Sequence, residues 1–190
     1  MKINKCDRGY IEAKKKRSII YTLITALIGI TVFIVGLFLN KMSNRNIFTV
    51  IAVLFALPAA KFLVGFIVVF PYHSVSRERY EKVKEHIVEG MELYTDLVIT
   101  SAEKVMNLDF AAVGNKQVLC LVGKKGQDIG YIRKYLSDGV NNWGSGYKVK
   151  VVDSEKIFIN ELDGVKTIEK DEKEQEEEEN VKSFLKSLIV

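Results

Sequence analysis

Side chains able to bind a metal or act as nucleophiles are few in this sequence and lie far apart. It contains two cysteines, Cys6 and Cys120, and two histidines, His73 and His86, and no pair of them has the spacing of a metal-binding motif. Cys120 lies in an apolar run, so we expect a small buried residue of a strand. Because no nucleophile, base and orienting group can be assigned to one site, we predict a protein that is not an enzyme and uses no metal or cofactor.

A basic, glycine-containing turn, formed by Lys124, Lys125 and Gly126 after Gly123, is the best candidate for binding a small anion. It precedes a predicted helix, whose N-terminal amide groups would attract negative charge. The turn lacks the spacing of the Walker phosphate loop and the Ser or Thr that follows it. Glycine-rich turns also commonly do no more than connect a strand to a helix. A plain connection and an anion-binding turn therefore both fit the sequence.

One basic residue, Lys61, lies inside an otherwise apolar segment, three residues after Pro58. A lysine near the middle of a membrane span costs roughly 2.5–3.5 kcal/mol, and such residues often have a function. Pro58 also leaves the backbone carbonyl of Leu54 without its helical hydrogen bond. Two interpretations follow: Lys61 lines a polar path in an oligomer, or its ammonium group reaches lipid phosphates through local thinning and tilt.

Two apolar segments, residues 18–39 and 47–70, are long enough to cross a hydrocarbon core of about 30 Å as helices. The short connection between them predicts an antiparallel transmembrane hairpin. Small residues recur along both segments at helical spacing and predict close packing, either within one chain or between chains. They are Ala26, Gly29, Gly36, Ala52, Ala56, Ala59 and Ala60.

The distribution of basic residues predicts the orientation of this hairpin. Seven lysines and arginines lie in residues 1–17 and four in residues 72–84, whereas the connection between the apolar segments holds only Lys41 and Arg45. Basic residues are concentrated on the cytosolic side of membrane proteins. We therefore expect a multi-pass protein of the cell membrane with both termini in the cytosol.

Residues 72–165 have the pattern of a small α+β domain, which we expect to pack in two layers. Ser74 or Ser76 can cap a first helix that stops at Gly90. A three-strand meander, a second helix and one or two further strands follow. The predicted strands cover residues 93–101, 106–113, 117–123, 147–153 and 156–162, and the second helix covers residues 127–143.

This element order is similar to the core of the PD-(D/E)xK nuclease superfamily over about residues 76–153. Asp109 sits at the position of the family's strand aspartate. The next strand departs from the pattern, because Val122-Gly123-Lys124, or Cys120-Leu121-Val122, stands where the family has Glu-x-Lys. Without the second carboxylate, the resemblance implies this topology without a divalent-metal site. The same element order also occurs in unrelated α+β domains, so the resemblance concerns topology alone.

The C-terminal part combines an acidic segment with an apolar stripe. Residues 166–179 predict a solvated linker that is disordered or loosely helical. Residues 180–190 predict an amphipathic helix capped by Asn180, too short to be stable without a surface to pack on. That surface could be the same chain or a sister subunit, the membrane interface, or a partner's groove. The stripe consists of Val181, Phe184, Leu185, Leu188 and Ile189.

These patterns together predict a basic cytosolic N-terminus (1–17), a two-helix transmembrane hairpin (18–71), a cytosolic α+β domain (72–165), an acidic linker (166–179) and an amphipathic C-terminal helix (180–190). The preferred function is a membrane-anchored binding or scaffold domain without catalysis, acting as a homo-oligomer. The alternative is a ligand-gated membrane effector, with a nucleotide as one candidate ligand, in which Lys61 lines a pore. We expect the lipid bilayer and a protein bound by the C-terminal helix as partners. No nucleic acid is expected, because the net charge is only +4.

Overall fold

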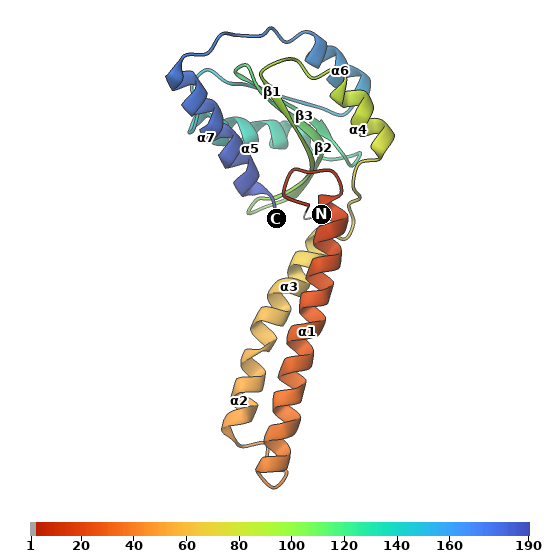
Figure 1. The fold of residues 1–190 in the computed structure, drawn as a ribbon, viewed down its shortest axis with the longest axis vertical. Helices are drawn as coiled ribbons and strands as arrows, with labels where there is room; N and C mark the ends of the chain where they lie inside the picture. The colour runs from red at the N-terminus through yellow and green to blue at the C-terminus, as the bar shows by residue number, and fades with distance from the viewer. Residues whose placement is uncertain (1–2) are drawn as a thin grey trace. The chain divides into compact units, whose positions relative to one another are not determined.

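The computed structural model describes residues 3–190. The chain forms two compact units: an α+β unit, made of the residues up to Ile11 together with residues 72–190, and a helical unit of residues 12–71. Figure 1 labels the elements in chain order. The helices are α1 (Tyr10–Leu39), α2 (Ile47–Leu54), α3 (Ala56–Val69), α4 (Arg77–Lys84), α5 (Ile129–Asn141), α6 (Glu155–Asp163) and α7 (Glu172–Leu188). The strands are β1 (Met91–Thr100), β2 (Val105–Gly114), β3 (Gln117–Val122) and β4 (Lys148–Val152).

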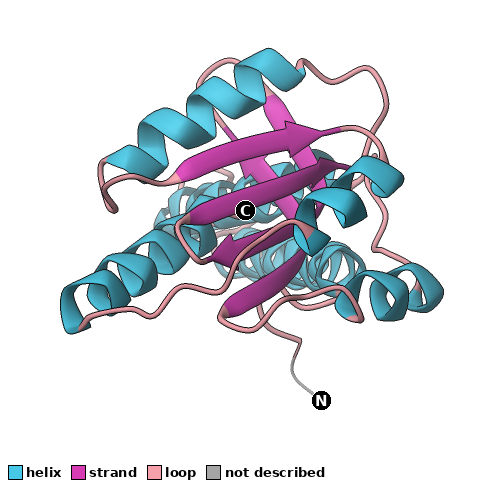
Figure 2. Ribbon diagram, turned by 90° about the horizontal axis from the view of Figure 1, so that it is seen from above, coloured by secondary structure: helices cyan, strands magenta, loops and turns pink. Residues whose placement is uncertain are grey.

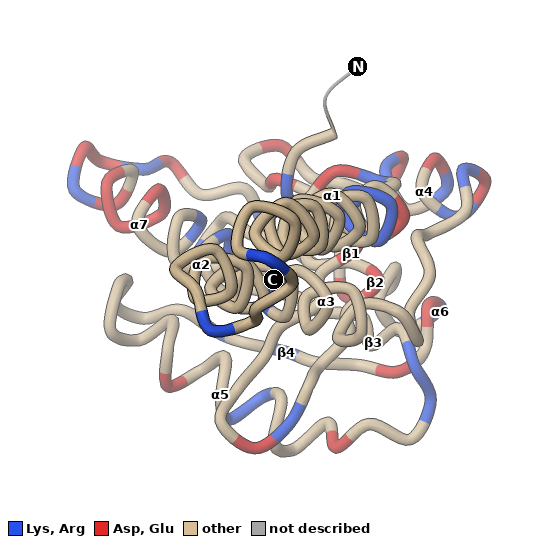
Figure 3. Tube along the Cα trace, turned by 90° about the horizontal axis from the view of Figure 1, so that it is seen from below, with Lys and Arg blue, Asp and Glu red and all other residues tan. Residues whose placement is uncertain are grey.

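Both apolar segments are helical, although α1 begins at Tyr10, before the predicted start at residue 18, and the second segment is divided between α2 and α3. Two helical stretches, Tyr10–Leu39 and Ile47–Val69, are long and apolar enough to cross a membrane. Their side chains are largely exposed within the unit: Leu23 is 63% and Leu57 69% exposed. In Figure 3 the coils of α2 are tan, without acidic or basic residues. The second stretch consists of two helices, because it is interrupted at Phe55, one turn before Pro58.

Two of the small residues pack inside the helical unit. Gly29 lies against Phe55, and a Cβ atom on this glycine would be 3.0 Å from the Cβ atom of Phe55. Gly36 lies against Phe48 so closely that an added Cβ would overlap with the ring-bearing side chain. These glycines let the backbones approach within one chain, which is one of the two alternatives that the sequence offers.

The α+β unit is built on one mixed sheet with the strand order β1-β2-β3-β4. Strands β1, β2 and β3 form the predicted antiparallel meander, and β4 pairs with β3 in parallel after the chain passes through α5. Figure 2 shows helices on both sides of the strands. One apolar cluster contains residues of α5 and α7, and the other contains residues of α4 and α6.

The prediction of two layers is therefore wrong, because helices cover both faces of the sheet. Alternate residues of β2 reach opposite clusters: Phe110 and Ala112 belong to one, Ala111 and Val113 to the other. All four of these side chains are fully buried. A strand buried on both faces carries a continuous apolar run instead of alternating apolar and polar residues.

Two element predictions in this unit are wrong. Residues 156–162 form most of helix α6 and not a strand, and Phe158, Ile159 and Leu162 give it one buried face. A short apolar run does not distinguish these two structures by its pattern alone. Helix α4 ends at Lys84, before the predicted stop at Gly90, and Ser76 accepts the capping hydrogen bond from the backbone of Arg79.

In the acidic linker, for which disorder and loose helix were both predicted, residues 172–179 are helical and form the first half of α7. Asp171 caps this helix and forms a capping box with Glu174, so Asn180 is not the cap. Ion pairs hold the acidic half in place: Glu174 binds Lys116 at 2.6 Å, and the nearly buried Glu178 binds Lys170 at 2.8 Å. Helix formation is favoured by these acids near the N-terminal end of the helix dipole.

The apolar stripe of the tail is covered by its own chain. Val181, Leu185 and Ile189 are buried in the cluster that α5 contributes to, and Phe184 and Leu188 pack against it. The ring of Phe184 lies directly over Gly139 of α5, and Ile189 forms an antiparallel bridge with Ile99 of β1.

The first residues of the chain also belong to the α+β unit instead of forming a separate basic segment. The backbone N–H of Thr95 donates to the carbonyl of Cys6 at 2.9 Å, so the segment before α1 contacts the free edge of β1. The backbone N–H of Val190 donates to the carbonyl of Val98 on the same strand. Both segments cover an edge that would otherwise expose unpaired backbone groups.

Candidate functional site

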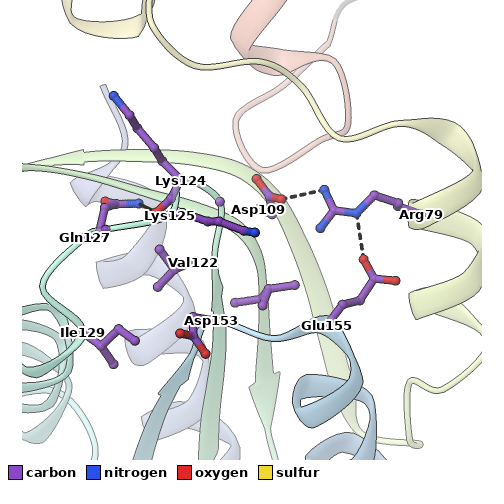
Figure 4. A pocket seen from close by; sticks show the side chains of 12 residues that line it. Arg79, Asp109, Val122, Lys124, Lys125, Gln127, Ile129, Asp153 and Glu155 are labelled. Carbon is purple, nitrogen blue, oxygen red and sulfur yellow. Dashed lines mark hydrogen bonds and ion pairs between the residues drawn. The ribbon is translucent and has the colours of Figure 1, made fainter.

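A cleft of about 720 Å³ opens where β3 and β4 end and the chain turns into α5 and α6. Because these two strands are parallel, the segments that follow them meet at the same edge of the sheet, where ligands of such sheets commonly bind. Figure 4 shows the side chains that line it. They are Arg79, Asp109, Leu121, Val122, Gly123, Lys124, Lys125, Gly126, Gln127, Ile129, Asp153 and Glu155.

The predicted basic turn, Lys124, Lys125 and Gly126, forms one wall of this cleft. Gln127 fixes the turn to β2: its side chain accepts from the backbone N–H of Asn107 at 2.8 Å and donates to the carbonyl of Asn107 at 2.9 Å. Gly126 has a φ of +85°, a conformation that glycine adopts without strain. The turn is therefore held by specific contacts and not by the apolar core.

The two lysines of the turn differ in direction. Figure 4 shows the side chain of Lys125 directed toward the Asp109 side of the cleft, whereas Lys124 points away from it. Both lysines are exposed, and neither forms an ion pair with a carboxylate of residues 3–190. Lys125 is thus a cation in the cleft that forms no ion pair with the described residues.

Opposite the turn, Arg79 of α4 binds two carboxylates. Its Nη1 atom donates to Asp109 Oδ2 at 2.7 Å and its Nε atom donates to Glu155 Oε2 at 2.7 Å. Lys82 donates to the other oxygen of Glu155 at 2.9 Å. The guanidinium carbon of Arg79 lies over the ring of Phe110, 5.6 Å from its centre, in a cation–π contact.

The electrostatics of this cluster favour the charged forms. Burial alone would raise the pKa of Glu155, but the hydrogen bonds from Arg79 and Lys82 outweigh it, and the pKa is lowered. Burial likewise acts to lower the pKa of Arg79, but its bonds to Glu155 and Asp109 raise it. The two carboxylates thus share a cation supplied by the protein itself.

Local geometry of β2 brings Asp109 into the cleft. The register between β2 and β3 shifts between Leu108 and Phe110, so Asp109 sits at an irregularity of the ladder. Such bulges redirect a side chain. Gly123 lies against the side-chain oxygens of Asn107 and Asp109, and any Cβ there would overlap with both. A glycine at position 123 is therefore required for these polar groups to point at this edge.

The sequence did not indicate Asp153, Glu155 or Arg79 as site residues. Asp153 and Glu155 follow β4, and the mistaken strand at residues 156–162 concealed that Glu155 begins a helix beside β3. The available signal was the serine-glutamate pair, Ser154-Glu155, which is common where a helix begins. Arg79 looked like one of several exposed basic residues on α4.

Anion binding by the N-terminus of α5 does not fit the structure. Asp128 caps this helix, accepting from the backbone N–H of Tyr131 at 3.0 Å, and its other oxygen binds Lys104 at 2.9 Å. A carboxylate of the chain already occupies the position that an anion would take. Any anion in the cleft would be held by side chains of the turn.

Among residues 3–190, no three His, Cys, Asp or Glu side chains are placed to hold a metal ion. Asp109 lies at the edge of the cleft. Its nearest cation, however, is Arg79. Asp109 is therefore paired with a cation of the chain itself.

The other residues singled out in the sequence lie elsewhere. Lys61 is exposed on α3, and Pro58 is in the first turn of the same helix. Cys6 and Cys120 are buried, and burial raises the pKa of each thiol to about 12, which makes both unreactive near neutral pH. His86 contacts Asp163 at 2.8 Å on the surface. Comparisons with protein-family models, with curated proteins and with solved structures found no match.

Proposed function

We propose that this chain is a membrane-anchored binding protein, in which two helical spans hold a cytosolic α+β domain that binds a small phosphorylated or otherwise anionic ligand without transforming it. The helical stretches Tyr10–Leu39 and Ile47–Val69 would be the anchor. The basic residues before the first span and after the second favour a cytosolic α+β domain.

One observation carries the ligand class: two donors of the cleft, the Lys125 ammonium group and Arg79 Nη2, form no hydrogen bond with the described residues. Lys125 points into it without a carboxylate partner. The Nη2 atom of Arg79 makes no hydrogen bond to the described residues, while Nη1 and Nε are used. A phosphate could accept from Lys125 and Nη2 together, over an apolar floor formed by Leu121, Val122 and Ile129.

Binding is tested with the full-length protein in nanodiscs, by isothermal titration with inorganic phosphate, AMP and ATP as probes. We expect at least one probe to bind, and Lys125→Gln to weaken its binding roughly tenfold. Lys124→Gln should have a smaller effect, because that side chain points away from the cleft. Lys134→Gln is the matched control, because Lys134 is also exposed but lies on α5, outside the residues that line the cleft. Failure of all three probes, or equal affinity in all variants, would overturn the proposed ligand class.

The proposal of a non-catalytic domain is tested separately. Purified protein incubated with Mg²⁺ or Mn²⁺ and DNA, RNA or a phosphate monoester should give no turnover above a buffer control. Arg79 binds the two carboxylates that would otherwise attract a cation. Turnover that disappears in Asp109→Ala would show that the domain is an enzyme.

Lys61 supports a second candidate, a ligand-gated pore. It is exposed on α3 and pairs with no carboxylate of the described chain, and the helix break at Phe55 lies within two turns of it. In this proposal several copies of the hairpin assemble, and Lys61 faces a polar path for anions. Liposome leakage that requires the cleft ligand and is lost in Lys61→Leu would support it. A ligand-binding protein that remains monomeric in nanodiscs and releases no dye would exclude it.

A further inference from the structure

A shallow groove of about 360 Å³ runs along one face of α1 near its beginning. It is lined by Ala13, Lys16, Arg17, Ile20 and Tyr21, which recur at the spacing of one helix face. The groove thus changes along the helix from two basic side chains to two largely apolar ones. All of these residues belong to the helical unit.

The two cations of the groove have no acidic partner in the described chain. Lys16 and Arg17 are exposed and take part in no ion pair of residues 3–190, whereas their neighbour Lys15 binds Glu12 at 3.2 Å. Two adjacent, unneutralised cations favour an anion at this end of the groove.

The apolar end of the groove is fixed by packing. The ring of Tyr21 lies 5.2 Å from the ring of Phe62 on α3, centre to centre, and the two rings are tilted by 51°. Ile20 is 42% exposed, and the helix continues without a charged residue to Leu39. This end therefore offers a rigid apolar surface and no polar group for a soluble anion, apart from the hydroxyl of Tyr21.

We propose that the groove binds one anionic phospholipid, with its phosphate on Lys16 and Arg17 and the first part of an acyl chain along Ile20 and Tyr21. The helical rise places Ile20 about 6 Å further along the axis than Lys16, which matches the step from a headgroup phosphate to the start of the hydrocarbon. A phospholipid at the membrane interface has its charged headgroup and its acyl chain in the same order as the basic and the apolar residues of this groove. The inference rests on the proposed membrane insertion, because a lipid presents both groups only there.

The test measures which lipids stay with the protein. Full-length protein is extracted in mild detergent from membranes containing both phosphatidylglycerol and phosphatidylcholine, and retained lipids are counted by native mass spectrometry. We expect wild type to retain one phosphatidylglycerol in preference to phosphatidylcholine. The double variant Lys16→Gln/Arg17→Gln should reduce the retained anionic lipid roughly tenfold.

The matched control is Lys41→Gln/Arg45→Gln, which removes two exposed cations at the other end of the hairpin. Retention in this control together with loss in the Lys16/Arg17 variant supports the site. Equal loss in both variants, or equal retention in all three proteins, overturns it. Carbonate extraction of the same membranes separates the two proposals: release of wild type into the soluble fraction would overturn the anchor itself, whereas a protein that stays in the membrane without lipid preference overturns only the groove.

Discussion

At the scale of single residues, the chemistry of the cleft depends on where the charge of Arg79 goes. Its guanidinium group joins Asp109 of β2 to Glu155 at the start of α6, so it links three elements of the α+β unit. A cation between two carboxylates both neutralises them and fixes their distance. The same residue thus stabilises the fold and limits what else these carboxylates can bind.

We expect Arg79→Met to lower the free energy of unfolding of the α+β unit by roughly 1–3 kcal/mol, because Asp109 would keep a poorly solvated charge without its partner. The Asp109 side chain is only 12% exposed. Urea denaturation followed by circular dichroism measures the change. Lys104→Met is the control: it breaks an ion pair with Asp128 in which both side chains are about half exposed, and should change this free energy by less than about 1 kcal/mol. Equal losses would contradict the assignment.

The Arg79 contact also predicts a pH dependence. The folded pKa of Glu155 lies below the ordinary value of 4.5, so its contribution to stability is complete above that pH and is lost as the pH falls through the folded pKa. Wild type should therefore lose stability more steeply than Arg79→Met when the pH is lowered below about 4.5. Denaturation midpoints at pH 3 to 7 for both proteins would check this, and parallel curves would show that the contact does not affect the pKa of Glu155.

At the scale of elements, α7 packs its buried apolar face on the core that α5 shares. Leu185→Ala should cost roughly 2–4 kcal/mol, because this side chain is 1% exposed in the core that α5 shares. Leu188→Ala, which shortens a partly buried leucine of the same helix, should cost clearly less. Thermal denaturation of both variants gives the comparison. If Leu185→Ala were no worse than Leu188→Ala, the stripe would not be packed on its own chain.

The elements differ in how far sequence could predict them. The apolar segments of the helical unit and the meander were predictable because their lengths and turn residues are unambiguous. Helix α6 was not, since Phe158, Ile159 and Leu162 fit a short strand as well as one helix turn. The presence of helices on both faces of the sheet could have been predicted from β2. Its run from Leu108 to Val113 has a single charged residue, Asp109, and no alternation of apolar and polar residues, which is typical of a strand covered on both faces. The basic turn was predictable from its composition, but Arg79 and Glu155 join it only through tertiary structure.

At the scale of the whole molecule, the chain leaves the α+β unit after Ile11 and returns to it at Tyr72. Both of these segments are bound by one buried carboxylate, Asp96. Its Oδ2 atom accepts from the backbone N–H of Gly9 at 2.7 Å, and its Oδ1 atom accepts from the backbone N–H of Val75 at 2.9 Å. Asp96 itself is 1% exposed and has a φ of +58°, which distorts β1 at this point. One side chain therefore holds both segments against the sheet.

Burial raises the pKa of Asp96 above its ordinary 3.8, although hydrogen bonds from Ser74, Val75, Gly9 and Ile11 act against this shift. Because the folded state holds this proton more tightly, the contribution of Asp96 to stability falls as the pH rises from about 3.8 through the folded pKa. The hydrogen bonds from the backbone N–H groups of Gly9 and Val75 therefore require that the charged Asp96 carboxylate is buried, which costs free energy. This free-energy cost is consistent with Asp96 serving to fix the two segments in place, and not to maximise the stability of the fold.

Asp96→Asn tests the hydrogen bonds of Asp96 without changing its backbone conformation. Asparagine tolerates a positive φ, but it offers one acceptor oxygen where aspartate offers two. An amide N–H would then face one of the two backbone donors, and we expect a loss of roughly 1–3 kcal/mol at neutral pH. Hydrogen exchange measured by mass spectrometry should become faster in peptides covering the segment, residues 3–11 or residues 72–80, whose backbone donor faces the new amide N–H. Asp138→Asn, at an exposed position on α5, should leave both unchanged. Unchanged exchange in both segments would show that the Asp96 carboxylate does not hold them.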